Sequence, residues 1–302
     1  MRHPQNFRAW CRRGLAAGLV LFALVPSAGA YLASGDRVFV PTVVLPQQIA
    51  PGNDLYIWGS NQPIAGDGKL TEFNGTFAKE ITERLGIVVD DIWTRSHVPG
   101  NGAQYGWLNL DAEVKYLAVD DQPHEFLLTV GLDHEFGGTG AARAGASHFS
   151  ANTPRLYFGK GLGDFDIGYL RPLAIRGLVG YQFSDSAPRP DLVQAGAVIE
   201  YSIPYLESKV QSLNLPEPFR RMTPITEIYF TMPGGQSFGA RTTGLICPGV
   251  SYAGDGWDFL VEALVPVSKA TAAGTGVVAQ LHLSFDFLFA GTPLGQPLFP
   301  GR

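Results

Sequence analysis

Near the end of the chain, apolar and polar residues alternate over a stretch that a helix cannot sort into two faces. From Val277 to Phe289, apolar side chains occupy every second position, while residues such as Gln280 and His282 fill the positions between them. Successive side chains of a β-strand point to opposite faces, so this stretch has one apolar face and one polar face. The pattern fits a soluble sandwich with an apolar core or a membrane barrel whose apolar face meets lipid.

The length of the alternating stretches decides between these two folds. The clearest further stretches are 107–118, 125–136, 173–183, 193–203 and 257–267, and weaker ones lie near 53–60, 69–80, 85–96, 153–162, 222–232 and 241–252. The clear stretches run for roughly 10 to 13 residues, close to the ~9 to 11 that a tilted strand needs to cross a bilayer and longer than the usual ~5 to 6 of soluble sheets. The sequence therefore predicts an all-β fold, a closed antiparallel transmembrane β-barrel of about 12 strands.

The connections between the stretches also differ in length. They are short at 83–84, 120–123 and 253–256, and longer or richer in Gly, Ser and Pro elsewhere. Outer-membrane barrels have tight periplasmic turns and longer external loops, so we expect both termini on the periplasmic side. The stretch 207–221 is too long for a tight turn, and we predict a periplasmic connection with a short helix there.

The first 30 residues have the features of a secretory signal peptide. A basic stretch is followed by an apolar run from Leu15 to Val25 and by the small residues Ala28 and Ala30. The run is shorter than the roughly 20 residues of a membrane-spanning helix, which disfavours the alternative of an uncleaved anchor. We therefore expect a signal peptide at 1–30, an N-terminal periplasmic segment at 31–50, the outer-membrane barrel at 51–289 and a C-terminal periplasmic tail at 290–302.

Composition excludes several classes of protein. The chain has 22 basic and 27 acidic residues, a net charge of −5, and no basic cluster beyond the signal peptide, which disfavours nucleic-acid binding. Cys247 is the only cysteine outside the signal peptide, so no disulfide framework is expected. Asp133, His134 and Glu135 are metal-ligand types, but neighbours on a strand point to opposite faces and cannot share one ion. We expect neither a metal nor a cofactor.

The polar faces of the strands would converge on a common lumen in which acidic residues dominate. Such a lumen must be hydrated or crossed by ion pairs, because carboxylates are very unfavourable in a dry interior. A selective aqueous path and a charge-paired interior that only stabilises the barrel both fit this pattern. The predicted lumen-lining residues are Asp111, Glu113, Lys115, Glu125, Asp133, Arg176, Glu200, Glu227, Arg241, Glu262, His282 and Asp286.

Four leucines interrupt this polar lining. By the same alternation, the inner face also carries Leu127, Leu178, Leu260 and Leu264. We therefore expect an acidic zone beside an apolar patch. Because rings of acidic side chains favour cations, a conducting lumen should prefer cations.

His282 and Ser284 share one face of the last strand and raise the alternative of a lipid-modifying hydrolase. In such an enzyme a histidine activates a serine nucleophile. An enzyme that acts on lipid must present this pair to the bilayer, whereas Leu281 and Leu283 occupy the lipid side and leave the pair inside. We expect no enzymatic activity, and keep a hydrolase and a structural barrel with a closed lumen as alternatives to a channel.

Two features resemble known outer-membrane barrels. Phe285, Phe287 and Phe289 resemble the C-terminal recognition signal of such barrels, although 13 residues follow Phe289. This resemblance implies handling by the barrel assembly machinery and a final setting in outer-membrane lipid. The segments HEFLLTVGLDHEFGGTG (124–140), TPRLYFGKGLGDF (153–165), GAVIEYSIPYLES (196–208) and 241–250 resemble the transporter-like barrels grouped as the meta-pathway phenol-degradation family. That second resemblance implies a porin-like protein of a Gram-negative outer membrane that passes small hydrophobic or aromatic compounds.

Overall fold

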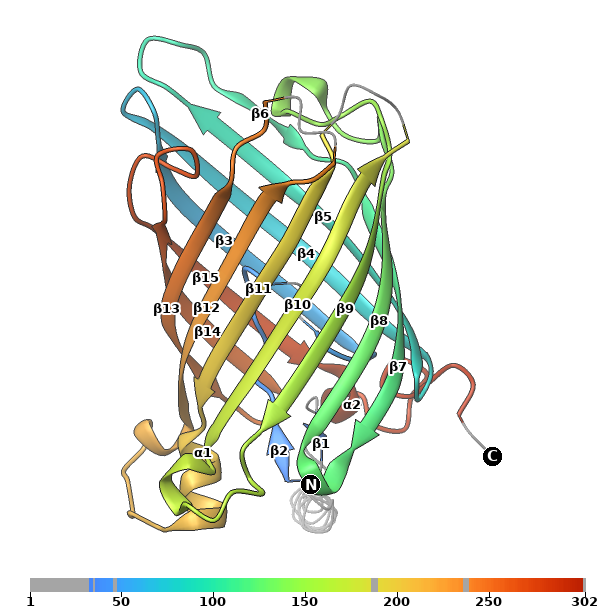
Figure 1. Ribbon diagram of the computed structural model, residues 1–302, viewed down its shortest axis with the longest axis vertical. Coiled ribbons are helices and arrows are strands. Elements are labelled where there is room, and N and C mark those ends of the chain that lie inside the picture. The colour runs from blue at the N-terminus through green and yellow to red at the C-terminus, as the bar shows by residue number, and fades with distance from the viewer. Residues whose placement is uncertain (1–32, 35, 46–47, 186–189, 236–238, 301–302) are drawn as a thin grey trace, which may run out of the picture.

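The computed structural model describes residues 33–34, 36–45, 48–185, 190–235 and 239–300, so the predicted signal peptide lies outside the described residues. In this part of the chain, twelve long antiparallel strands form one closed barrel (Figure 1). Consecutive strands are paired, and the last strand pairs with the first long strand to close the barrel. The long strands are β3 (Asp54–Ile64), β4 (Gly68–Thr82), β5 (Leu85–His97), β7 (Asp111–Asp121), β8 (Phe126–Glu135), β9 (Ala151–Gly161), β10 (Leu173–Ser184), β11 (Leu192–Tyr201), β12 (Met222–Pro233), β13 (Thr243–Ala253), β14 (Trp257–Pro266) and β15 (Gly276–Ser284).

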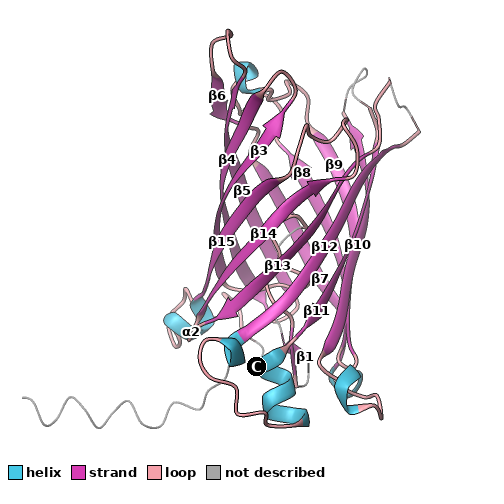
Figure 2. Cartoon of the chain, turned by 90° about the vertical axis from the view of Figure 1, so that its left-hand side faces the viewer, coloured by secondary structure: helices cyan, strands magenta, loops and turns pink. Residues whose placement is uncertain are grey.

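Short elements lie at the two ends of the barrel (Figure 2). At one end, named the terminal end, are the small hairpin β1 (Ala33–Ser34) and β2 (Arg37–Val38) and the helices η1 (Gln122–His124), η3 (Gly168–Leu170), α1 (Ile203–Tyr205), η4 (Leu206–Val210), η5 (Phe219–Arg221) and α2 (Phe285–Leu288). At the other, the loop end, are β6 (Gln104–Trp107), which pairs with β5, and η2 (Ala142–Ala144). The connection 207–221 therefore contains short helices, as predicted. Among the described residues, no helix is both long enough and apolar enough to span a membrane.

The alternation of residue types maps onto the two faces of the barrel wall. Val179 and Val261 point outward with 50% and 37% of their surface exposed, whereas Thr129 and Glu262 point inward and are 0% and 1% exposed. Large apolar side chains are likewise exposed along the outside of most strands. These positions confirm the predicted barrel and the predicted assignment of residues to its outer and inner faces. An apolar outside and a polar inside are what a barrel in lipid requires.

Most of the described residues between β2 and β3 lie within the barrel. Residues 36–45 and 48–53, called the inner segment below, run from β2 at the terminal end into the lumen (Figure 1). Phe39, Leu45 and Ile49 are buried there against apolar residues of the strands. The sequence predicted an N-terminal periplasmic segment at 31–50, and the described part of this stretch packs against the inner wall of the barrel. The physical reason is that its apolar side chains find an apolar inner wall to pack against.

The last strand is shorter than its alternation suggests. Ser284 pairs with Asp54, the first residue of β3, so no partner strand remains for the chain beyond this point. The backbone turns into α2, where Phe289 N–H donates to the carbonyl of Phe285 over 2.8 Å. The following residues return to the wall, and Leu298 N–H donates to the carbonyl of Glu80 over 3.1 Å.

Candidate functional site in the barrel lumen

Most of the predicted lumen residues lie on the inner faces of the strands. Glu125 lies just before β8 at the terminal end and is also buried. The strands direct inward Asp111, Glu113 and Lys115 of β7, Asp133 of β8, Arg176 of β10, Glu200 of β11, Glu227 of β12, Glu262 of β14 and His282 of β15.

Two predicted lumen residues lie elsewhere. Arg241 is exposed in the connection before β13, because that strand begins only at Thr243. Asp286 belongs to α2 at the terminal end, where its Oδ1 accepts a hydrogen bond of 2.6 Å from Asn53 Nδ2. Burial, reinforced by the charge of Asp54, raises the pKa of Asp286 to about 6 even though the Asn53 bond opposes the shift.

Glu227 binds the middle of the inner segment. Its Oε1 accepts from Val43 N–H over 2.7 Å, and its Oε2 accepts from Val44 N–H and Leu45 N–H over 3.0 and 2.8 Å. Successive backbone N–H groups that point to one spot form an anion-binding concavity. This fully buried carboxylate thus satisfies three backbone donors that no strand pairs with.

Arg37 anchors the same segment at the terminal end. Its Nε lies 3.1 Å from Glu125 Oε2, and the guanidinium lies over the ring of Tyr205, 4.1 Å from its centroid. Arg37 also donates to the backbone carbonyls of residues 171, 172 and 173. A buried charge is tolerated only with such a complete set of partners.

Lys115 provides a third anchor. Its Nζ donates to the carbonyl of Gln48 over 2.7 Å and lies 3.4 Å from Glu113 Oε2. Three ionisable groups of the predicted lining, Lys115, Glu125 and Glu227, therefore take part in holding the inner segment.

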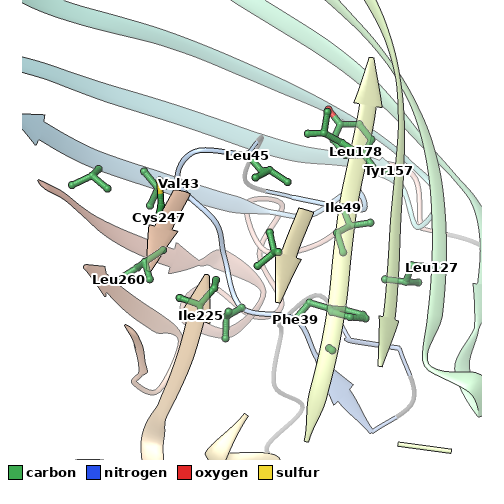
Figure 3. Packing of buried hydrophobic residues seen from close by; sticks show 14 of the residues in the cluster. Phe39, Val43, Leu45, Ile49, Leu127, Tyr157, Leu178, Ile225, Cys247 and Leu260 are labelled. Atoms are coloured by element: carbon green, nitrogen blue, oxygen red, sulfur yellow. The ribbon is translucent and has the colours of Figure 1, made fainter. Parts of the chain in front are cut away.

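The predicted apolar patch exists, and the inner segment covers it (Figure 3). Leu127, Leu178, Leu260 and Leu264 point inward and form one cluster with Phe39, Val43, Leu45 and Ile49. Glycines of the wall leave room for this contact: a Cβ on Gly159 would stand 2.7 Å from Ile49 Cδ1, and one on Gly196 would stand 3.0 Å from Leu45 Cγ. Cys247 is a buried free thiol in the same cluster.

The inner segment separates two cavities. The loop-side cavity has a volume of about 280 Å³, and the terminal-side cavity one of about 220 Å³. Gln48 and Tyr56 line both. A solute that enters from one end would therefore meet the inner segment before it reached the other cavity.

An ion-pair network crosses the loop-side cavity. Arg155 contacts Asp133 Oδ2 at 3.0 Å and Glu113 Oε2 at 3.5 Å, and Tyr157 O–H donates to Glu113 Oε1 over 2.6 Å. Sequence reasoning did not select Arg155 or Tyr157. The alternation of Thr153, Arg155 and Tyr157, which places all three on the inner face, was the signal that could have found them.

His282 lies between two carboxylates. Its Nδ1 is 2.8 Å from Asp258 Oδ2, its Nε2 is 2.8 Å from Asp54 Oδ1, and its ring stacks on Tyr56 with centroids 4.5 Å apart. Because both ring nitrogens have carboxylate partners, neither is placed to activate Ser284. Among the described residues, no group of three or more His, Cys, Asp or Glu side chains is arranged to hold a metal ion.

Comparisons with solved structures give the class of protein. The chain is similar to an outer membrane channel from Pseudomonas putida F1, with a TM-score of 0.50 and 14% identity over 80% of this chain and 99% of that one. It is also similar to the KdgM porin (TM-score 0.48, 12% identity, 76% and 99% covered) and to LpxR from Salmonella typhimurium (0.47, 9%, 77% and 100%).

The similarity to the Pseudomonas channel and the apolar outer surface indicate the same class of protein. The chain is a twelve-stranded β-barrel of the bacterial outer-membrane type. No protein-family model matches the sequence. No curated protein matches it either, so the phenol-degradation grouping stays a prediction.

Proposed function

We propose that this barrel is a gated channel that lets small molecules cross the outer membrane, and that the inner segment is its gate. The observation that carries the proposal is the way in which the segment is held. Its described residues form no β-ladder with the strands of the wall, and are held instead by side-chain anchors and apolar packing between two polar cavities. A segment held in this way can leave without opening the hydrogen-bonded wall of the barrel.

A structural barrel with a closed lumen is the second candidate. The apolar cluster under the inner segment favours it, because exposing Leu127, Leu178 and Leu260 to water would oppose opening. A channel and a scaffold differ in one measurable property. Only a channel conducts when the segment is released.

Hydrophobic or aromatic solutes are the substrate class that the family resemblance implies. Such a solute would find apolar inner wall at Leu178 and Leu260 once the inner segment had moved aside. The hydrolase alternative gains no support from His282, whose two nitrogens are both occupied. We place the terminal end in the periplasm, as the predicted secretion and assembly route requires.

Single-channel recording in planar bilayers tests the proposal. Glu227→Gln keeps the size of the side chain but offers the three backbone N–H groups of the segment one neutral oxygen in place of a carboxylate. We expect rare, short openings for the wild type and a several-fold higher open probability for Glu227→Gln.

The matched control is Glu262→Gln on β14, which is separated from β12 by β13. Glu262 lies beside Glu227 in the lumen, but neither of its carboxylate oxygens has a hydrogen-bond partner in the described part of the inner segment, so this variant tests whether loss of a buried carboxylate is by itself enough to open the channel. This variant should therefore open no more often than the wild type. If neither the wild type nor either variant conducts, the closed scaffold is favoured. Release of fatty acid from phospholipid would favour the hydrolase.

A further inference from the structure

The wall of the loop-side cavity carries three carboxylates side by side. Asp90 of β5 is paired in register with Asp111 of β7, and Asp111 is paired with Glu135 of β8. All three line the cavity. Like charges directly opposite one another on neighbouring strands destabilise a sheet, so this row calls for a compensating group.

Within the described part of the chain, no cation of the cavity lining forms an ion pair with Asp90 or Asp111, and Glu135 accepts a hydrogen bond of 2.7 Å from Asn109 Nδ2. The lining contains five acidic residues, Asp90, Asp111, Glu113, Asp133 and Glu135, against two basic residues, Lys115 and Arg155. Lys115 is paired with Glu113, and Arg155 with Asp133 and Glu113. Among the described residues, Asp111 has no hydrogen-bond or ion-pair partner, and Asp90 has only the neutral amide of Asn74, at 3.4 Å.

The floor of the cavity gives an independent indication of a bound donor. Gln48 is 4% exposed and lines the cavity, yet its Oε1 has no hydrogen-bond partner among the described residues. A buried acceptor without a partner is unfavourable unless a ligand or water supplies a donor. Beside Gln48 the floor is apolar, formed by Val43, Val44 and Leu45 of the inner segment.

We propose that the loop-side cavity is a binding site for a small organic cation, with an ammonium group at the Asp90–Asp111–Glu135 row and an apolar body over the floor. This inference rests on the proposed channel function and names a substrate class for it. Trp58 and Tyr229 also line the cavity and offer aromatic faces that attract cations. The cavity volume of about 280 Å³ lies near the lower end of the ~300 to 1,000 Å³ of ligand pockets, which suits a small organic molecule.

The apolar floor also decides which kind of cation fits. An inorganic cation takes oxygen ligands on all sides, and no metal-ligating group of three or more side chains exists in the described part of the chain. An organic ammonium needs oxygen atoms on one side only and gains from apolar contact on the other. The combination of an acidic wall and an apolar floor therefore favours the organic cation.

Calorimetric titration of the mature chain in detergent micelles tests this site. The probes are phenethylammonium, its neutral analogue phenethyl alcohol, the anion phenylacetate, and calcium ions. We expect saturable binding of phenethylammonium, at least about tenfold weaker binding of the alcohol, and no binding of phenylacetate. Calcium at millimolar concentration should not displace the amine.

Asp111→Asn is the diagnostic variant, and Asp67→Asn is its matched control. Asp67 lies at the same end of the barrel, in the exposed β3–β4 turn with φ of 56°, a conformation that asparagine also adopts readily. We expect Asp111→Asn to weaken binding of phenethylammonium at least about tenfold and Asp67→Asn to leave it unchanged.

Four outcomes would overturn the proposal. They are no saturable binding of the amine by the wild type, equal binding of alcohol and amine, displacement of the amine by calcium, and loss of amine binding in Asp67→Asn. Retention of the circular-dichroism spectrum and of heat-modifiable gel mobility shows that Asp111→Asn is folded. Calorimetric titration measures binding and needs no passage through the barrel. Failure of the binding site and failure of the channel proposal, which conductance tests, can therefore be told apart.

Discussion

Arg37 and Glu125 illustrate how single residues decide where the inner segment lies. The pair is almost completely inaccessible to solvent, so each charge depends on its partner and on the backbone carbonyls around it. A buried pair of this kind adds little net stability over an apolar pair, but it makes any other position of Arg37 unfavourable. At the scale of residues, the pair therefore contributes more to specificity than to stability.

Removing one member of this pair should be costly. Arg37→Met leaves the Glu125 carboxylate buried without its cation, and we expect a loss of about 3 to 5 kcal/mol in the free energy of unfolding. Urea unfolding of the barrel in lipid vesicles, followed by tryptophan fluorescence, measures this. The control Lys209→Met breaks the exposed 2.6 Å pair with Asp36 and should change stability by ~1 kcal/mol or less. Equal effects of the two substitutions would contradict the role given to Arg37.

Asp286 should make stability depend on pH. Its pKa of about 6 in the folded chain lies above the ordinary 3.8 of an aspartate, so the folded state binds the proton more tightly than the unfolded state does. Stability from this group is therefore greatest at low pH and falls as the pH rises from about 4 to about 6. The unfolding midpoint of Asp286→Asn, compared with that of the wild type across this range, should lack this fall.

A contrasting aspartate gives the control for this measurement. A hydrogen bond from Lys160 lowers the pKa of Asp164, so its contribution to stability is lost as the pH falls, which is the opposite sign. Asp164→Asn should therefore leave the fall between about pH 4 and 6 in place. A wild type and an Asp286→Asn variant with parallel pH profiles would refute the assignment to Asp286.

The sequence allowed individual inner-face residues to be predicted where they lie within long alternating stretches. Glu113 and Glu262 fall in strands with unbroken period-two patterns, and both point inward. Arg241 lies before β13 begins and Asp286 lies after β15 ends, where the alternation of the sequence extends beyond the wall of the barrel. No local pattern could reveal that Glu227 binds backbone N–H groups almost 200 positions away in the chain.

At the scale of elements, the strands and the inner segment differ in what could be predicted. The strands repeat a pattern that only one kind of wall satisfies, so their faces followed from the sequence alone. The inner segment has no such period. Two local features indicate its position: its own apolar residues, such as Phe39 and Ile49, and glycines on the inner wall, such as Gly159. Neither feature can be interpreted until the closed barrel is known.

The outward face of β14 provides a prediction at this scale. Val261 lies in the middle of the strand on the lipid side, so Val261→Arg should destabilise the folded barrel by about 2 to 4 kcal/mol in lipid. The same substitution at Val267, just beyond the end of the strand, should have an effect of ~0 to 1 kcal/mol. Urea unfolding in vesicles measures both. A larger loss at Val267 than at Val261 would mean that the membrane does not cover the middle of the barrel.

At the scale of the whole molecule, two sets of interior charges stand out beside the ion pairs within the wall, such as Arg155 with Asp133. One set, which includes Lys115, Glu125 and Glu227, engages the inner segment. The other, Asp90 and Asp111, forms no ion pair with a cation in the described part of the chain and faces the loop-side cavity. In the proposed channel, the first set holds the gate and the second selects the solute. The acidic residues that the alternation places in the lumen therefore have two roles in the proposed channel, one in the gate and one in selectivity.

This division predicts the ion selectivity of an opened barrel. In Glu227→Gln, with the inner segment released, the reversal potential under a potassium chloride gradient should show cation preference, because uncompensated carboxylates raise the local concentration of cations. Adding Asp90→Asn and Asp111→Asn should move this potential toward zero, whereas adding Asp67→Asn at the exposed turn should leave it unchanged. Anion preference in Glu227→Gln, or a potential that the double substitution does not alter, would mean that these two carboxylates do not set the selectivity of the lumen.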